Sequence, residues 1–122
     1  MHELTVISHF SSAHNLRGYD GACENLHGHN WKVEASVTCQ RLDKLGMALD
    51  FKALKNALMK IVDALDHRYL NEVPPFDREN ATAENISRHI FTALSKALND
   101  GNIKVSGVRV WESETASALY SE

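Results

Sequence analysis

Apolar and polar positions alternate with a period of two in the first forty residues. The clearest stretch is His27 to Gln40, where every second position is apolar or histidine and the positions between are polar or charged. This is the pattern of a half-buried strand in an antiparallel sheet. The stretch from Glu3 to His14 is rich in strand-forming residues and predicts another strand before it. A loop with two glycines joins the two strands.

The period changes to that of amphipathic helices after a turn around Gly46. The first helix has Asp50 as a natural N-cap, and its apolar positions are Phe51, Leu54, Leu58, Ile61 and Leu65. A second helix is predicted after Thr82, with Glu84 placed to favour the helix dipole and Gly101 able to end the helix. Its apolar positions are Ile86, Ile90, Ala93, Leu94 and Ala97.

Two further strands are predicted at Ile103 to Glu112 and at about Thr115 to Tyr120. Gly107 is expected at a β-bulge, because the apolar alternation shifts phase there. The order ββααββ predicts one α+β domain over residues 1–122, with a four-stranded antiparallel sheet and two helices on one face. Such an open sheet has two free edges, so association of copies through these edges is expected.

Composition excludes several classes of partner. The 122 residues carry a net charge of −3 and therefore no basic field for nucleic acid or anionic lipid. No apolar run approaches the roughly 20 residues of a membrane span, and the cytoplasm is the expected location. The two cysteines, Cys23 and Cys39, are expected to be free thiols, with Cys39 in the core.

Three histidines stand out as candidate metal ligands. His27 and His29 are two apart on a strand, so their side chains leave the same face about 6.6 Å apart. If the first two strands pair, His14 lies beside them, and three imidazoles with an open fourth position suit catalytic zinc. Two alternatives remain open on spacing alone. The histidines are merely packed and hydrogen-bonded, or Cys23 completes a closed structural site.

Other residues could carry proton chemistry. Cys23 is either a small buried residue or, near a dication, a thiolate base. The adjacent Asp66 and His67 could form a proton relay, although the residues alone favour a solvated helix end. Glu112 continues the apolar pattern of the last long strand, and a carboxylate there suggests a ligand with adjacent N–H donors.

Six stretches together resemble the 6-pyruvoyltetrahydropterin synthase family, and most its bacterial branch, the 6-carboxytetrahydropterin synthases of queuosine biosynthesis. They run almost end to end: FSSAH at 10–14, CENLHGHNW at 23–31, MALDF at 47–51, LDHRYLN at 65–71, ATAENI at 81–86 and VWESETA at 110–116. The spacing of three residues between Cys23 and His27 is similar to that branch, whereas the animal pyruvoyl enzymes have a longer gap. A third branch has glutamate in place of this cysteine.

The resemblance implies a role for each candidate residue. The implied zinc ligands are His14, His27 and His29. The implied general base is Cys23, with Asp66 and His67 as its partner relay. The implied pterin-binding residues are Glu112, which anchors the ring, and Thr82 and Glu84 in the pocket. Ala83 departs from relatives that carry a hydroxyl there, which removes one hydrogen bond from the pocket.

The resemblance also implies an assembly and a reaction. The family has the tunnelling fold (T-fold), whose subunits join sheet edges into a barrel, commonly as a hexamer with active sites between subunits. Asp66 and His67 would then serve a neighbour's zinc. The implied reaction converts 7,8-dihydroneopterin triphosphate to 6-carboxy-5,6,7,8-tetrahydropterin and releases acetaldehyde and triphosphate. The alternatives are 6-pyruvoyltetrahydropterin synthesis without carbon–carbon cleavage, and a non-catalytic zinc- or pterin-binding module.

Overall fold

The computed structural model describes residues 1–21 and 24–122 and has the predicted order of elements, with one short 3₁₀ helix added. The strands are β1 (His2–His14), β2 (His27–Cys39), β3 (Ile103–Ser113) and β4 (Ala116–Tyr120). The helices are α1 (Phe51–Asp63), the 3₁₀ helix η2 (Leu70–Glu72) and α2 (Ala83–Leu98).

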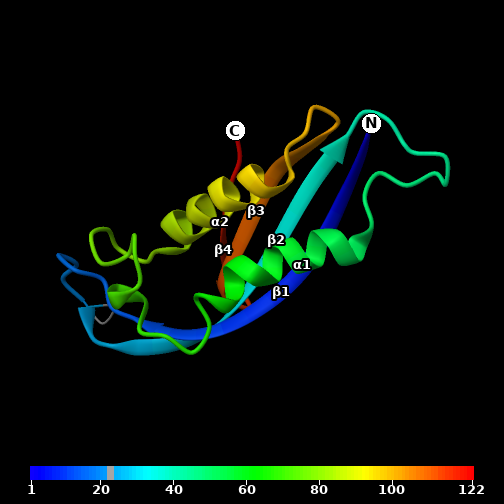
Figure 1. Ribbon diagram of the computed structural model, residues 1–122. Coiled ribbons are helices and arrows are strands. Elements are labelled where there is room, and N and C mark those ends of the chain that lie inside the picture. Colours follow the sequence, from blue (N-terminus) through cyan, green and yellow to red (C-terminus); the bar gives the residue numbers. More distant parts are fainter. Residues whose placement is uncertain (22–23) are drawn as a thin grey trace.

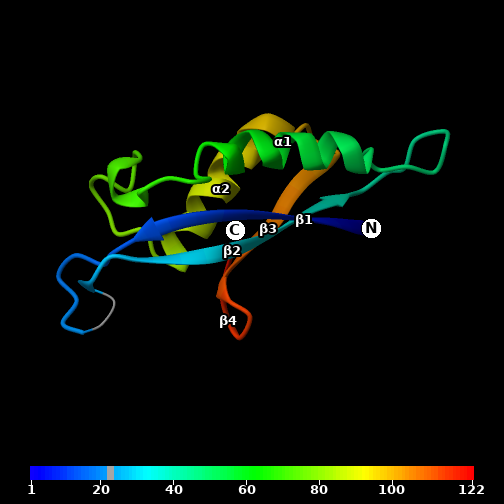
Figure 2. The same cartoon turned by 90° about the horizontal axis from the view of Figure 1, so that it is seen from below.

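The four strands form one antiparallel sheet in the order β1-β2-β3-β4. Both long helices lie on the same side of this sheet, and the other face is left open (Figures 1 and 2). The predicted α+β architecture, with its two helices on one face, is therefore confirmed. β1 and β4 are the edge strands of this sheet, and the end of β1 also bonds on its outer side to residues 67–69, where the Ala13 N–H donates to the Arg68 carbonyl and the His67 N–H donates to the Ser11 carbonyl.

The predicted bulge lies where the alternation changes phase. Ser36 of β2 faces Gly107, but the next residue, Val37, faces Val105, so Ser106 is the extra residue on β3. The bulge restores the inward orientation of the following apolar positions. As a result, the face that buries the valines of β3 also carries Glu112 near the end of the strand.

Both predicted N-caps are present. The Asp50 side chain accepts a hydrogen bond from the backbone N–H of Lys52 at 2.8 Å, and Thr82 Oγ1 accepts one from Asn85 at 3.1 Å. The predicted end of the second helix is wrong by a few residues, because α2 stops at Leu98 and Gly101 lies in the following turn.

The side chains after α2 explain its early end. Asn99 Oδ1 accepts from the N–H of Val105, and Asp100 Oδ1 accepts from the N–H groups of Asn102 and Ile103. Such local side-chain acceptors compete with continued helix and favour a turn.

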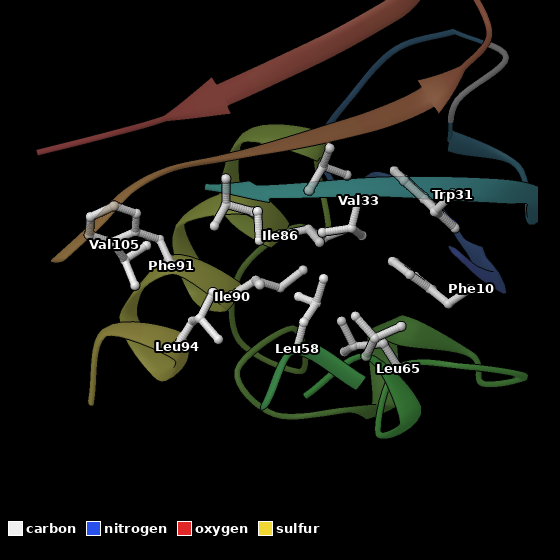
Figure 3. Packing of buried hydrophobic residues seen from close by; sticks show 14 of the residues in the cluster. Phe10, Trp31, Val33, Leu58, Leu65, Ile86, Ile90, Phe91, Leu94 and Val105 are labelled. Carbon is white, nitrogen blue, oxygen red and sulfur yellow. The ribbon is translucent and has the colours of Figure 1, made fainter. Parts of the chain in front are cut away.

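The core lies between the sheet and the two helices. Figure 3 shows side chains from α1 and α2, such as Leu58 and Ile90, facing Val33 and Trp31 of β2. Trp31 is fully buried and stacks on Phe10 with ring centroids 5.7 Å apart. The expected burial of Cys39 is confirmed.

One predicted core position lies outside this core. Phe51 shares the helical spacing of the apolar stripe but is 58% exposed, because it is the first residue of α1. Leu65 lies beyond the end of α1 and is nevertheless buried. Among the helices of the described ranges, none combines the length and the apolar character that crossing a bilayer requires.

Truncation of Leu58 is expected to lower the free energy of unfolding by about 2–5 kcal/mol, because Leu58→Ala leaves a cavity in a fully packed interface. Met59→Ala, one position along the same helix and 42% exposed in the wild type, is the matched control and should change stability by about 0.5 kcal/mol or less. Urea unfolding at one fixed protein concentration measures both. Equal losses in the two variants would contradict the described core.

Candidate metal centre

Pairing of β1 with β2 brings the three predicted ligand histidines together. His14 lies opposite His27, and Ser12 lies opposite His29, so the three imidazoles share the face that points toward the helices. Their candidate ligand nitrogens all lie within 4.8 Å of one another. The expectation that the two strands pair and the three rings converge is confirmed.

Backbone carbonyls determine which ring nitrogens are free. His14 Nδ1 lies 2.7 Å from the carbonyl oxygen of Ala81, and His27 Nδ1 lies 2.7 Å from that of Asn25. A carbonyl oxygen only accepts, so each Nδ1 carries the proton and donates. Each Nε2 then keeps its lone pair, which is the arrangement of a histidine ready to bind a metal.

Two ring nitrogens of the three histidines are buried without a hydrogen-bond partner. Within the part of the chain that the structure describes, His14 Nε2 and His29 Nε2 have no partner. Buried polar atoms nearly always have one, so a pair of such atoms aimed at one point needs an explanation. A bound metal ion would provide it, because three neutral imidazoles are a ligand set that zinc favours.

Burial keeps two of these rings neutral. It lowers the pKa of His14 below the ordinary 6.5, and the hydrogen bond with the Ala81 carbonyl opposes this only in part. Burial also lowers the pKa of His29, against the opposing effect of the Glu112 charge. The neutral imidazole is the form that binds metal, so both shifts favour coordination near neutral pH.

Glu112 lies beside the histidines, as its place in the strand pattern suggested. Its Oε1 is 3.6 Å from His29 Nε2, and its side chain is about one-third exposed. A pocket of about 320 Å³ opens next to it, and the other lining residues are Ala83, Glu84, Ala116, Ser117 and Ala118. Two carboxylates, Glu112 and Glu84, thus face one pocket at the margin of the metal centre.

Thr82 has a different place from Glu84. Its hydroxyl caps α2 by accepting from Asn85, and it is not among the residues that line this pocket. Ala83 does line the pocket.

Asp66 and His67 form a pair on the outer edge of β1. Asp66 Oδ1 accepts from the backbone N–H of Ser11 at 2.9 Å, and its Oδ2 lies 2.9 Å from His67 Nδ1. The Ser11 hydrogen bond, followed by the bond to His67, lowers the pKa of Asp66. The carboxylate is therefore ionised and holds the proton of the imidazole on Nδ1.

The His67 ring faces outward from this edge. Its side chain is 82% exposed, and its φ of 54° is in the left-handed region that non-glycine residues rarely adopt. Across residues 1–21 and 24–122, no hydrogen bond or ion pair joins the Asp66–His67 pair to the three histidines. The described residues of one chain therefore bring Glu112 together with the three histidines, but not Asp66 and His67.

Cys23 lies outside the described residues, so its role as a base stays a prediction. The groups that sequence reasoning missed are the carbonyls of Ala81 and Asn25 and the N–H of Ser11. Every residue carries such groups, so no residue type could have pointed to them.

A family model described as 6-pyruvoyl tetrahydropterin synthase matches residues 3–122. The chain belongs to the 6-pyruvoyl tetrahydropterin synthase family. Members of this family include two curated relatives named 6-carboxy-5,6,7,8-tetrahydropterin synthase. That of Haemophilus influenzae is 31% identical over 136 residues and covers 93% of this chain and 94% of its own length. That of Synechocystis sp. is 36% identical over 116 residues, covering 91% and 86%.

Solved structures of the family have the same fold. The 6-pyruvoyl tetrahydropterin synthase of Caenorhabditis elegans superposes with a TM-score of 0.84 over 98% of this chain and 94% of that chain, at 24% sequence identity. This likeness shows the fold, and the expected T-fold architecture is confirmed.

The metal-free protein is expected to lose stability as the pH falls below about 6.5. His14 and His29 have lowered pKa values in the folded chain, so below the ordinary value the unfolded chain binds protons that the folded chain does not. The loss should continue until the lowered pKa values are reached. Urea unfolding across this pH range measures the slope.

His14→Gln should flatten this pH dependence. His9→Gln is the control, because His9 lines a pocket on the open face of the sheet with Lys32 and Trp111. An unchanged slope in His14→Gln would show that the buried ring does not cause the effect.

Proposed function

We propose that this chain is a zinc-dependent 6-carboxytetrahydropterin synthase. The reaction takes 7,8-dihydroneopterin triphosphate and water to 6-carboxy-5,6,7,8-tetrahydropterin, acetaldehyde and triphosphate. The observation that carries the proposal is the convergence of three imidazoles beside the pocket of Glu112, with buried Nε2 atoms of His14 and His29 that have no hydrogen-bond partner among the described residues. The curated relatives of that name support the choice of reaction.

The proposed zinc ligands are the Nε2 atoms of His14, His27 and His29. A zinc ion on three ligands keeps an open position, and it lowers the pKa of a bound hydroxyl as it does that of bound water. The neutral state of His14 and His29 supports this role, because neither ring has to lose a proton near pH 7.

Glu112 and Glu84 are proposed to bind the pterin ring. An ionised carboxylate only accepts hydrogen bonds, and the pyrimidine edge of a pterin offers adjacent N–H donors. Glu112 stands between the histidines and the pocket, so a ring bound to it would direct its side chain toward the metal centre. Thr82 is proposed to act on the pocket through the start of α2, which its hydroxyl caps.

Cys23 is proposed as the general base, with His67 as its partner in proton transfer. Asp66 holds Nδ1 of His67, which leaves Nε2 of the exposed ring to take up or release a proton. The two groups would move protons to and from the side-chain carbons of the substrate. Triphosphate leaves, and a retro-aldol-type cleavage then releases acetaldehyde.

We further propose that the active protein is a homo-oligomer, a hexamer by resemblance, with active sites between subunits. The exposed His67 at the outer edge of β1 and its separation from the three histidines support this assembly. Within residues 1–21 and 24–122 no hydrogen bond or ion pair joins Asp66 or His67 to the three histidines of the same chain, which suits a role at the histidines of a neighbour. The proposed location is the cytoplasm.

Incubation of the zinc-loaded protein with 7,8-dihydroneopterin triphosphate is expected to yield 6-carboxytetrahydropterin and acetaldehyde in equal amounts. Mass spectrometry of the pterin, with an assay for acetaldehyde, measures both. Formation of 6-pyruvoyltetrahydropterin without acetaldehyde would instead favour the activity in the family's name. Binding of zinc and pterin without turnover would favour a non-catalytic module.

Cys23→Ala and His67→Ala are each expected to keep zinc and to lose turnover, because each lacks one proton-transfer group. Mixed oligomers of the two variants, reassembled after mild denaturation, should regain part of the activity, since some sites combine an intact cysteine with a neighbour's intact histidine. His67→Ala reassembled alone is the control. Loss of zinc in Cys23→Ala would mean a fourth ligand, and absence of complementation would contradict shared sites.

A further inference from the structure

The orientation of His14 depends on a carbonyl that lies outside regular structure. Ala81 comes just before α2, at the end of a segment that begins after η2, and its carbonyl oxygen accepts from His14 Nδ1. Any shift of Ala81 would rotate the ring and move Nε2 away from the point where the three ligand nitrogens converge. What holds Ala81 in place therefore matters for the metal centre.

Arg17 connects this segment to the end of β1. Its Nη1 donates to the carbonyls of Phe76 at 3.0 Å and Glu79 at 3.5 Å, and its Nη2 donates to the carbonyl of Asn71 at 3.0 Å. The planar guanidinium suits several acceptors held at fixed angles, and its charge strengthens each bond. Figure 1 shows the loop after β1 and the segment before α2 at the same end of the sheet.

Asn80 completes the connection from the other side. Its Oδ1 accepts from the backbone N–H of Arg17 at 2.9 Å, and its Nδ2 donates to the backbone carbonyl of Arg17 at 3.0 Å. The carbonyl of Asn80 accepts from Asn85 Nδ2 in α2 at 2.9 Å. The residue directly before Ala81 is thus bound both to the loop after β1 and to α2.

These contacts close a ring of hydrogen bonds around the metal ligand. The chain runs from His14 to Arg17, crosses to Asn80, passes to Ala81 and returns to His14. Asn71 of η2 also bonds to the backbone of Asn15, but among the described residues the bonds of Arg17 and Asn80, together with that between His14 and Ala81, are those that reach the segment between η2 and α2 from the end of β1. The ring fixes both the donor and the acceptor of the bond between His14 and Ala81.

We propose that Arg17 and Asn80 form a clamp that positions His14 for metal binding. They are positioning residues, because they act on the metal through Ala81 and His14. The inference rests on the metal centre of the proposed function and deepens it. It concerns metal affinity alone and is independent of which pterin product is formed.

The test compares Arg17→Met with Arg88→Met. Arg17→Met keeps an unbranched stem of similar length and removes all the donors of the guanidinium. Arg88 in α2 also contacts the segment, but through the side chain of Glu79 at 2.9 Å rather than through backbone carbonyls, and its other partner is the side chain of Asn85 in α2 at 3.1 Å. The two variants therefore lose the same charge near the same segment, and only one loses the clamp.

Zinc affinity, measured by competition with a chromophoric chelator, should fall about 10–100-fold in Arg17→Met, the usual effect of removing support for a metal ligand. It should be unchanged in Arg88→Met. Arg17→Lys should regain only part of the loss, because one ammonium group cannot reach all three carbonyls. Bound cobalt(II) should also show a changed visible spectrum in Arg17→Met, since the ligand geometry changes.

A merely structural role predicts a different result. Arg17→Met would then lower the melting temperature of the metal-free protein while the folded fraction bound zinc as tightly as the wild type, and this result would overturn the clamp. If Arg17→Met does not fold, Asn80→Asp provides the second test. It keeps the Oδ1 acceptor, loses the Nδ2 donor and should weaken zinc binding; unchanged affinity would overturn the proposal.

The outcomes separate this inference from the proposed reaction. A wild type that binds zinc without converting the substrate contradicts the reaction and leaves the comparison of Arg17→Met with Arg88→Met decisive. Turnover of the substrate by the wild type, together with equal zinc affinity in Arg17→Met, keeps the reaction and overturns the clamp. A wild type that binds no zinc overturns both.

Discussion

The antiparallel register of β1 against β2 is the constraint on which the candidate site depends. It places His14 directly opposite His27 and Ser12 opposite His29, so the three imidazoles, with their candidate metal-ligand nitrogens, share one face. A shift of one residue would send one set of side chains to the opposite face of the sheet. The core secures the register, because Phe10 and Trp31 stack on the same face and Trp31 Nε1 donates to the Ser12 carbonyl.

Burial of this face has an electrostatic consequence at the histidines. The burial that holds the strands together also lowers the pKa values of His14 and His29, and within the described residues their Nε2 atoms have no hydrogen-bond partner. A site with unpartnered buried nitrogens is costly for the metal-free chain and favourable once a cation binds. The same unpartnered nitrogens therefore lower the stability of the metal-free chain and favour the binding of a metal ion. The carbonyl of Ala81 fixes the orientation of the His14 ring.

Asp66 and His67 have a different position in the fold from the three histidines. Asp66 is anchored to the backbone of Ser11 on the edge of β1, and His67 extends outward in a strained backbone conformation. The three histidines lie on the face of the sheet that points toward the helices, His14 on β1 and His27 and His29 on β2. The two parts of the proposed chemistry thus lie at different places, one on the helix-facing side of the β1–β2 pair and one at the outer edge of β1.

Sequence periodicity by itself determined the strands, the helices, both N-caps and the bulge at Gly107, because each depends on side chains close together along the chain. It also placed His27 and His29 on the same side of their strand, since alternate residues of a strand point to one face. Only the tertiary structure decided which carbonyl orients His14, and it exposed Phe51 although that residue shares the helical pattern. The orientation of His14 depends on a backbone group brought close from a distant position, and the exposure of Phe51 depends on where α1 begins relative to the sheet; neither leaves a pattern in residue type.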